Sequence, residues 1–418
     1  MKYLLTALIL SFCLITYSQT LSKVKPEEVG MSSERLGRVD NLINDLVMRH
    51  QIPGATVLIL RNGKTAFTKS YGYSDLDKKT FLKDNDIFRI ASQTKAITSL
   101  AVMMLFEDGK FLLDEPVHKY IPEFKSPTVL VSFNEKDSSY TTEPAKSEIT
   151  IRQLLTHTSG IDYAAIGSKE MKAIYAKAGV LSGIGTNNTV LADKMKILGK
   201  LPLRHQPGEK FTYGLNTDVL GYLVEVLSKT SLDDFFAKRI FAPMGMKDTY
   251  FYLPKEKYSR LVALYETKGD KLMKIEGKAY DQSDPNYPNT LGTYYSGGAG
   301  LSSTVEDYAK FLQLFLNGGI YNGTRLLSRK TVELMLTNQV QPPLTTQFGL
   351  GFGLETPQND YQSILSSGSF SWGGAFNTHY WADPKEKLIG LIFTNMYNSP
   401  HWYIGDKFKV LTYQAIVD

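Results

Sequence analysis

The sequence contains a single cysteine, and it lacks several common catalytic patterns. Cys13 lies in the N-terminal apolar segment, so the chain beyond it can form neither a disulfide nor a cysteine-based metal site. The six histidines show no H-E-x-x-H spacing, which disfavours a zinc hydrolase. The G-x-S-x-G elbow and the G-x-x-x-x-G-K-[ST] phosphate loop are also missing. We therefore expect no metal and no cofactor.

Charge of one sign is not concentrated anywhere along the chain. The 47 basic and 42 acidic residues are intermixed, and the net charge is +5. Because there is no long basic run, a nucleic-acid partner is not expected. With 418 residues, of which 43% are hydrophobic, the chain can bury a large core and form two lobes.

The first residues predict a secretory signal peptide. Lys2 precedes an apolar run over residues 3–15, and small or polar residues follow, with Thr16 and Ser18 suited to a cleavage site. We therefore expect residues 1–18 to be removed.

Two other interpretations of this segment stay open. An uncleaved segment would anchor the chain, although the apolar run is short for a membrane span. A lipoprotein modified at Cys13 is the other, although Phe12 before it fits a lipid-attachment motif poorly. We expect the mature chain, residues 19–418, to be secreted or periplasmic without a stable membrane span.

Hairpin patterns near both ends of the chain predict one antiparallel sheet. The first contains Asn62-Gly63, a pair typical of a tight hairpin turn, and the second turns at Asp383-Pro384. The fold class predicted is α/β (α+β), with helices flanking a sheet built from distant segments. The expected elements are strands 55–60, 64–71, 378–382 and 388–393 and helices 33–50 and 406–417.

The middle of the chain is richer in helical patterns and predicts an inserted lobe. We expect a mostly helical lobe over about 92–290, and a sheet lobe that combines about 19–91 with 291–418. Polar residues at 132–148 and a stretch rich in Tyr, Asp, Asn and Pro at 276–295 predict long loops, which often border a site.

The segment Ser92-Gln93-Thr94-Lys95 places a hydroxyl nucleophile one helical turn before an amine. Serine and lysine three residues apart share one helix face, and the apolar residues that follow predict a deeply buried helix ending at Asp108-Gly109. A buried lysine can take the serine proton, and the helix N-terminus favours an oxyanion there. In isolation, the pattern also fits a capping serine and a solvated lysine.

A tyrosine ahead of a second helix is a candidate proton carrier. Tyr213 lies in a loop after Pro207-Gly208, just before a helix predicted to begin at Asp218. A tyrosine near an ammonium group can have its pKa lowered far enough to pass protons. Among 25 tyrosines, position alone favours a packing or surface role.

Two glycines mark a candidate oxyanion site. The run Trp372-Gly373-Gly374 comes just before Ala375 and a predicted strand. Glycines at a strand edge let another backbone or a substrate approach closely. The N–H groups of Ala375 and Ser92 could then hold an oxyanion. A bulge or tight bend is the alternative.

Together these three segments resemble the serine β-lactamase and penicillin-binding-protein family, above all its class C-like branch, which includes carboxylesterases and D-amino-acid peptidases. Their order matches over almost the whole mature chain. The resemblance implies that Ser92 is the acylated nucleophile, that Lys95 helps to deprotonate it and that Tyr213 shuttles protons. It also implies an oxyanion hole from the N–H groups of Ser92 and Ala375, and a structural role for His157.

Two positions depart from the family pattern. The family usually has Tyr-x-Asn, but Leu215 takes the asparagine position here and Asn216 follows one place late. The family usually has Lys-Thr-Gly, whose cation contacts a substrate carboxylate, but Trp372 takes that position. An indole can instead stack on an apolar acyl or alcohol group, which favours neutral esters. The expected substrate contacts are Trp372, Gly373, Gly374 and Asn216.

The sequence therefore predicts a secreted serine hydrolase that cleaves carboxylic esters through a Ser92 acyl-enzyme, with Lys95 and Tyr213 as proton-transfer groups. A β-lactamase or a D-Ala-D-Ala or D-amino-acid peptidase of the same family is the alternative. A non-catalytic binding protein is a third possibility, which the intact catalytic residues disfavour. The expected partner is a small-molecule ester or amide, whereas the natural substrate and the oligomeric state stay open.

Overall fold

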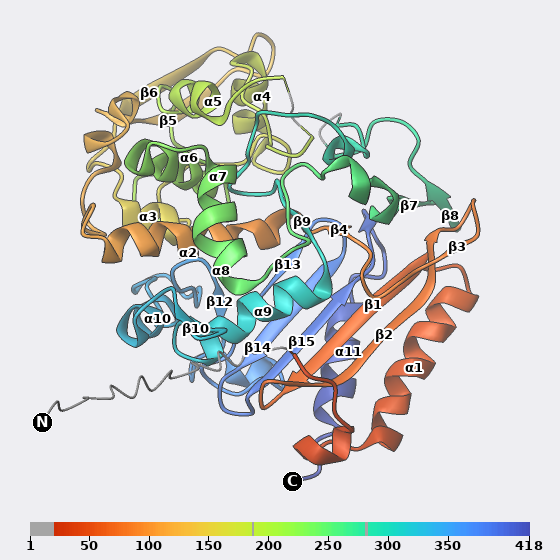
Figure 1. Cartoon of the computed structure of the whole chain (residues 1–418). Coiled ribbons are helices and arrows are strands. Elements are labelled where there is room, and N and C mark those ends of the chain that lie inside the picture. Colours follow the sequence, from red (N-terminus) through yellow and green to blue (C-terminus); the bar gives the residue numbers. More distant parts are fainter. Residues whose placement is uncertain (1–20, 186–187, 281–282) are drawn as a thin grey trace, which may run out of the picture.

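A computed structural model describes residues 21–185, 188–280 and 283–418 of the chain (Figure 1). The predicted signal peptide, residues 1–18, lies outside the described residues. Within these ranges, no helix combines the length and the apolar character needed to cross a membrane.

A seven-stranded antiparallel sheet forms the centre of one lobe, in the order β12-β13-β14-β15-β1-β2-β3 (Figure 1). Both predicted hairpins are confirmed, and β15 pairs with β1, so distant parts of the chain meet in one sheet. Asn62 and Gly63 have φ of 53° and 73°, the positive values that a tight hairpin turn needs. The strands are β1 (Gly54–Arg61), β2 (Lys64–Asp75), β3 (Thr80–Phe81), β12 (Gly353–Leu354), β13 (Phe370–Gly374), β14 (Thr378–Asp383) and β15 (Leu388–Phe393).

Helices cover both faces of this sheet, which confirms the predicted fold class. On one face lie α1 (Ser33–Met48) and α11 (Ile404–Tyr413), and their apolar side chains share a core with the sheet. On the other face lies α9 (Val305–Leu316). The predicted deep helix is α2 (Thr94–Glu107), buried nearly all round, and it runs between the sheet and the helical lobe (Figure 1).

The second lobe gathers most of the other helices around α6 (Figure 1). The central helix of this lobe, α6, begins at Asn216, two residues before the start at Asp218 that the sequence predicted. The remaining helices are α3 (Ile151–Leu155), α4 (Lys169–Lys177), α5 (Leu191–Leu198), α6 (Asn216–Ser228), α7 (Leu232–Phe236), α8 (Ala242–Met244) and, beside the sheet lobe, α10 (Arg329–Met335).

The prediction of a loop over 132–148 was wrong in part. A hairpin of β5 (Thr128–Phe133) and β6 (Tyr140–Pro144) occupies this segment. β-branched and aromatic residues favour strands even on a surface, and β6 is exposed along its whole length. Its polar side chains therefore reflect exposure and not the absence of a strand.

A smaller sheet connects the middle of the chain to the sheet lobe. The strand β7 (Tyr265–Lys268) pairs with β8 (Lys271–Lys274) and, in parallel, with β16 (Met396–Tyr397). Tyr265 is buried in the core that α1 and α11 share with the sheet. The sequence placed this segment in the helical lobe, but it packs on the sheet side.

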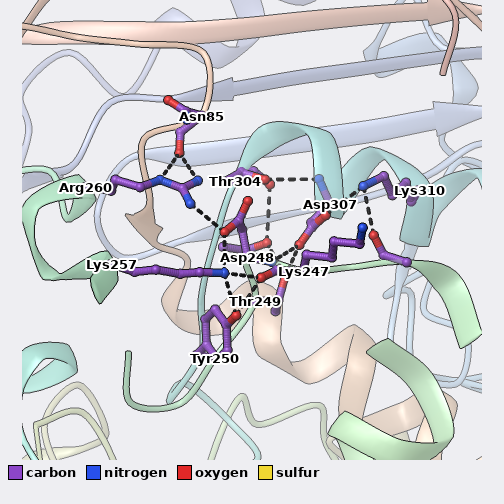
Figure 2. A network of polar contacts seen from close by, with 12 residues as sticks. Asn85, Lys247, Asp248, Thr249, Tyr250, Lys257, Arg260, Thr304, Asp307 and Lys310 are labelled. Atoms are coloured by element: carbon purple, nitrogen blue, oxygen red, sulfur yellow. Dashed lines mark hydrogen bonds and ion pairs between the residues drawn. The ribbon is translucent and has the colours of Figure 1, made fainter. Parts of the chain in front are cut away.

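A polar network fastens the segment after α8 to α9 (Figure 2). Asp307, buried in the first turn of α9, accepts hydrogen bonds from the Asp248 N–H at 2.6 Å, from Thr249 Oγ1 at 3.1 Å and from Lys310 Nζ at 2.9 Å. The Asp248 carboxylate in turn accepts from Arg260 at 2.7 Å. The network therefore ties a long connection to the helix that covers the sheet.

We expect Asp307→Ala to lower the free energy of unfolding by about 2–4 kcal/mol, because the Asp248 N–H and the Thr249 hydroxyl lose this acceptor and the Lys310 ammonium loses its buried partner. The matched control is Glu306→Ala. Glu306 is exposed and pairs with the same Lys310 ammonium at 3.2 Å, so its loss should change the free energy by less than about 1 kcal/mol. Urea denaturation of the two variants measures both values, and equal small losses would contradict the role given to Asp307.

Candidate active site

Ser92 lies in the short turn that delivers the chain into α2. The strand β4 (Phe88–Arg89) pairs with β9 (Ser302–Ser303), and the 3₁₀ turn Ala91–Gln93 follows. The helix itself begins at Thr94, two residues later than the sequence suggested. Ala91 has a φ of 41°, a strained value for a residue with a side chain, and such strain gathers at functional sites. Ser92 is partly exposed, so a substrate can reach it.

Neighbouring elements hold this turn in place. Tyr308 of α9 donates a hydrogen bond from its hydroxyl to the Gln93 carbonyl oxygen at 2.8 Å. The Leu301 N–H donates to Thr94 Oγ1 at 3.1 Å. Hydrogen bonds from two separate segments therefore hold the turn and the start of α2.

Lys95 is buried, with only 3% of its surface exposed. Its Nζ donates to the Gly298 carbonyl oxygen at 2.8 Å and to Tyr163 Oη at 3.3 Å. The same Nζ lies 4.6 Å from the centre of the Tyr213 ring. The alternative of a solvated lysine is thus excluded, and the structure brings Lys95 and Tyr213 together.

Tyr213 joins the second and third candidate segments. Its ring stacks on Tyr163 at 5.7 Å between centroids and lies 5.5 Å from Trp372. The Trp372 indole donates from Nε1 to Tyr213 Oη at 3.4 Å. Trp372 also contacts the ring of Phe348 at 5.3 Å. The phenol is therefore set in an aromatic wall beside a buried cation.

His157 holds the loop that carries Tyr213. Its Nδ1 accepts a hydrogen bond from the Gly214 N–H at 3.4 Å, and its ring lies 4.8 Å from the Tyr213 ring. Burial, together with the positive charge of Lys95, holds the pKa of His157 well below its ordinary value. Nδ1 can accept the Gly214 N–H only when Nδ1 carries no proton. The lowered pKa keeps the imidazole neutral and so permits this hydrogen bond.

Asn216 is placed differently from the prediction. It is fully buried at the start of α6, its Nδ2 lies 3.0 Å from His157 Nδ1, and its Oδ1 accepts from Ser159 Oγ. Both ends of the amide are thus occupied by protein groups. This arrangement organises the loops and is unsuited to the substrate contact expected of Asn216.

The glycine pair brings β13 directly against the turn that carries Ser92. A Cβ on Gly374 would collide with the Ile90 carbonyl oxygen, so only glycine permits this approach. Ala375, the next residue, is partly exposed beside this contact. The contact of β13 with the turn 91–93 brings Ala375 near Ser92. The oxyanion hole predicted from their N–H groups stays a prediction.

Sequence reasoning missed a buried carboxylate beneath Lys95. Asp218 Oδ1 accepts from Ser296 Oγ at 2.6 Å and from the Gly298 N–H at 3.4 Å. A Cβ on Gly298 would collide with Asp218 Oδ2 and lie 3.5 Å from Lys95 Nζ. Burial raises the pKa of Asp218, whereas the Ser296 hydroxyl and the Lys95 charge oppose that rise. Asp218 thus supports the turn whose carbonyl oxygen holds Lys95.

Tyr163 was missed as well. It is fully buried, and its hydroxyl accepts from Lys95. Burial raises the pKa of Tyr163 well above its ordinary value, so the phenol stays neutral. The only sequence signal for this part of the site was the glycine-rich run at 297–300, because glycines mark close approaches.

The Beta-lactamase family model matches residues 39–408, most of the chain. The chain belongs to the Beta-lactamase family. As a member of that family it is a serine hydrolase. This finding confirms the predicted family.

Individual relatives of this hydrolase agree with that assignment. It is 32% identical to Protein Rv1367c of Mycobacterium tuberculosis over 353 residues, which cover 81% of this chain and 84% of that protein. It is 26% identical to Esterase EstB of Burkholderia gladioli over 391 residues, which cover 90% and 94% of the two chains. The solved structure of EstCE1, a hydrolase with promiscuous acyltransferase activity, has the same fold, with a TM-score of 0.78, 24% identity, and coverage of 91% of this chain and 99% of that chain.

We expect Asp218→Ala to slow phosphonylation of the hydrolase by a fluorophosphonate probe by about 10- to 100-fold, because a displacement of about 1 Å in a catalytic group can cost that much. Asp218→Asn is the control: it keeps an acceptor oxygen for Ser296 and should retain more of the rate. Mass spectrometry of the labelled protein gives the rate, and thermal unfolding confirms that each variant is folded. Labelling of the alanine variant at the wild-type rate would contradict this role.

We expect protonation of His157 to reduce the stability of the hydrolase in acid. Its folded pKa lies below the ordinary value of 6.5, so below about pH 6.5 the unfolded chain binds more protons than the folded one. This contribution is fully present above pH 6.5 and is lost as the pH falls. Unfolding free energies of wild type and His157→Asn at pH 8, 6.5 and 5 measure it. The variant curve should be flatter, and parallel curves would exclude this contribution.

Proposed function

We propose that this hydrolase cleaves carboxylic esters through a Ser92 acyl-enzyme, with Lys95 and Tyr213 as its proton-transfer groups. One observation carries the proposal: the Tyr213 phenol lies between the buried Lys95 ammonium, 4.6 Å from its ring centre, and the Trp372 indole, which donates to its hydroxyl. A phenol next to a cation can develop negative charge.

The proposed reaction begins with Tyr213. Tyr213 takes the proton of Ser92 as the serine Oγ attacks the ester carbonyl, helped by the positive charge of Lys95 beside its ring. The N–H groups of Ser92 and Ala375 hold the oxyanion that forms. When the tetrahedral intermediate collapses, Tyr213 returns the proton to the departing alcohol. A water molecule, deprotonated by Tyr213, then attacks the acyl-enzyme. As the bond between Ser92 Oγ and the acyl carbon breaks, Tyr213 returns this proton to Ser92 Oγ and the carboxylic acid is released.

The residues around the nucleophile support an ester as the substrate. Trp372 is packed between Tyr213 and Phe348 and presents an apolar surface where the usual Lys-Thr-Gly motif of the family has a cation. Leu215, at the position of the usual asparagine, is fully buried and offers no amide group. Without those two polar contacts, recognition of a β-lactam carboxylate or a peptide amide is weakened. The relative named Esterase EstB agrees with this choice.

A β-lactamase or a D-Ala-D-Ala or D-amino-acid peptidase remains the second candidate, because the family model that matches the chain is the Beta-lactamase model. We also propose that the protein is secreted or periplasmic after removal of residues 1–18. The apolar run that follows Lys2 supports that location.

Purified protein should release p-nitrophenol from short acyl esters. Ser92→Ala and Lys95→Met should each abolish most of this activity, and Tyr213→Phe should lower kcat by about 100-fold or more, because general acid–base groups contribute about 10²–10⁴. The control is Ser22→Ala. Ser22 and Lys25 repeat the spacing of Ser92 and Lys95, but Ser22 is exposed, so its loss should leave the rate unchanged.

Nitrocefin and labelled penicillin separate the two candidates. Retention of most ester hydrolysis by Ser92→Ala would overturn the proposal. Nitrocefin turnover that matches ester turnover, with penicillin acylating Ser92, would favour the β-lactamase. If Trp372 is what disfavours β-lactams, Trp372→Lys should raise nitrocefin turnover relative to ester turnover.

A further inference from the structure

The edge of β13 continues past its pairing with β12 and reaches the turn that carries Ser92. Within the described chain, β12 pairs with β13 only at Phe370 and Ser371, so no strand lies beside residues 372–374 on that side. A molecule bound along a strand edge lies in the plane of the sheet and directs successive groups to its two faces. Trp372 lies on one face of the sheet. The ligand group that follows the one beside Trp372 would therefore lie on the opposite face, next to Gly373.

Trp402 lies on that opposite face. Gly373 pairs across the ladder with His379 of β14. A Cβ on Gly373 would lie 3.2 Å from Cζ2 of the Trp402 indole, so the ring reaches the strand because Gly373 has no side chain. Trp402 is nevertheless 45% exposed, although a residue of this size is usually buried for most of its surface. A large aromatic surface is therefore available beneath the substrate edge.

The Trp402 ring is held by His379. The two rings meet at 4.5 Å between centroids with an interplanar angle of 66°, an edge-to-face contact. A Cβ on Gly405 of α11 would lie 2.6 Å from the His379 ring, so a second glycine lets this histidine pack closely. Burial lowers the pKa of His379 to about 4. The ring that supports Trp402 is thus fixed and uncharged at neutral pH.

The backbone around Trp402 is fixed by a chain of polar contacts. His379 Nε2 lies 2.7 Å from Asn377 Oδ1, and Asn377 Nδ2 donates to Ser399 Oγ at 3.1 Å. Ser399 Oγ also accepts from the N–H of His401 at 3.1 Å, directly before Trp402. An aromatic surface held in place before binding loses little entropy when a ligand stacks on it.

We propose that Trp402 forms a binding subsite for a planar aromatic group of the ester, on the face of the sheet opposite Trp372. This inference rests on the proposed function and narrows its substrate class to esters that carry an aryl group. Aromatic pairing strengthens binding by about 2- to 10-fold beyond simple burial of area. Trp402 therefore favours an aromatic ring over a saturated ring of similar size.

Matched pairs of esters test the subsite. Benzyl acetate and cyclohexylmethyl acetate differ only in the aromaticity of the alcohol, and the p-nitrophenyl esters of phenylacetic and cyclohexylacetic acid differ in the same way in the acyl group. In Trp402→Ala the ratio of kcat/KM for aromatic over saturated ester should fall by about 2- to 10-fold for at least one pair. Trp402→Phe should keep part of the preference. Tyr403→Ala, which removes the exposed aromatic next to it, should leave both ratios unchanged.

Unchanged ratios for both pairs in Trp402→Ala, with ester turnover intact, would overturn the subsite and leave the proposed function standing. Absence of Ser92-dependent turnover would instead overturn the proposed function. The subsite is then decided by calorimetry on Ser92→Ala, with benzyl acetate and cyclohexylmethyl acetate as ligands. A preference for the benzyl ester that Trp402→Ala removes supports it, and equal binding of both esters overturns it.

Discussion

The buried ammonium of Lys95 is the interaction on which the site depends. An isolated charge in a protein interior is costly unless hydrogen bonds and opposite charge compensate it. Here the compensation comes from the Gly298 carbonyl oxygen, the Tyr163 hydroxyl and the nearby carboxyl group of Asp218. These groups belong to separate segments of the chain. Compensating the charge of Lys95 therefore requires those segments to pack against one another. The Tyr213 ring then receives the cation on its face.

Close approach without side chains is the second constraint. Gly298 leaves room for the Asp218 carboxylate, and Gly374 leaves room for the Ile90 carbonyl oxygen just before the turn that carries Ser92. Gly373 leaves room for the Trp402 indole. A Cβ at 298 or 374 would lie under 3.0 Å from a neighbouring atom, which forces a rearrangement. A Cβ at 373 would lie 3.2 Å from the indole, which would have to shift slightly. The site is thus built from backbone surfaces that meet directly, with aromatic rings filling the remaining space.

Local patterns predicted the fold well because its main signals are local. The turn at Asn62-Gly63 and the apolar stripe of α2 each depend on neighbours in sequence. The strand β6 was missed because an exposed hairpin has no apolar face to reveal it. The supporting role of Asp218 was not predicted, and Asn216 was predicted to contact the substrate although protein groups bind its amide. Their partners, Ser296 and His157, lie far away in sequence, so only the tertiary structure shows these contacts. The family resemblance correctly grouped Lys95, Tyr213 and Trp372, which lie together in the structure. The groups that support them required the tertiary structure.

The pairing of β1 with β15 has a consequence for how the molecule is made. The first long strand finds its neighbour more than three hundred residues downstream, Thr56 opposite Phe393. Contacts so distant in sequence close late and make folding slow. During synthesis the turn that carries Ser92 emerges long before β13, the strand that packs against it. The two halves of this contact can meet only after residues 370–374 have been made.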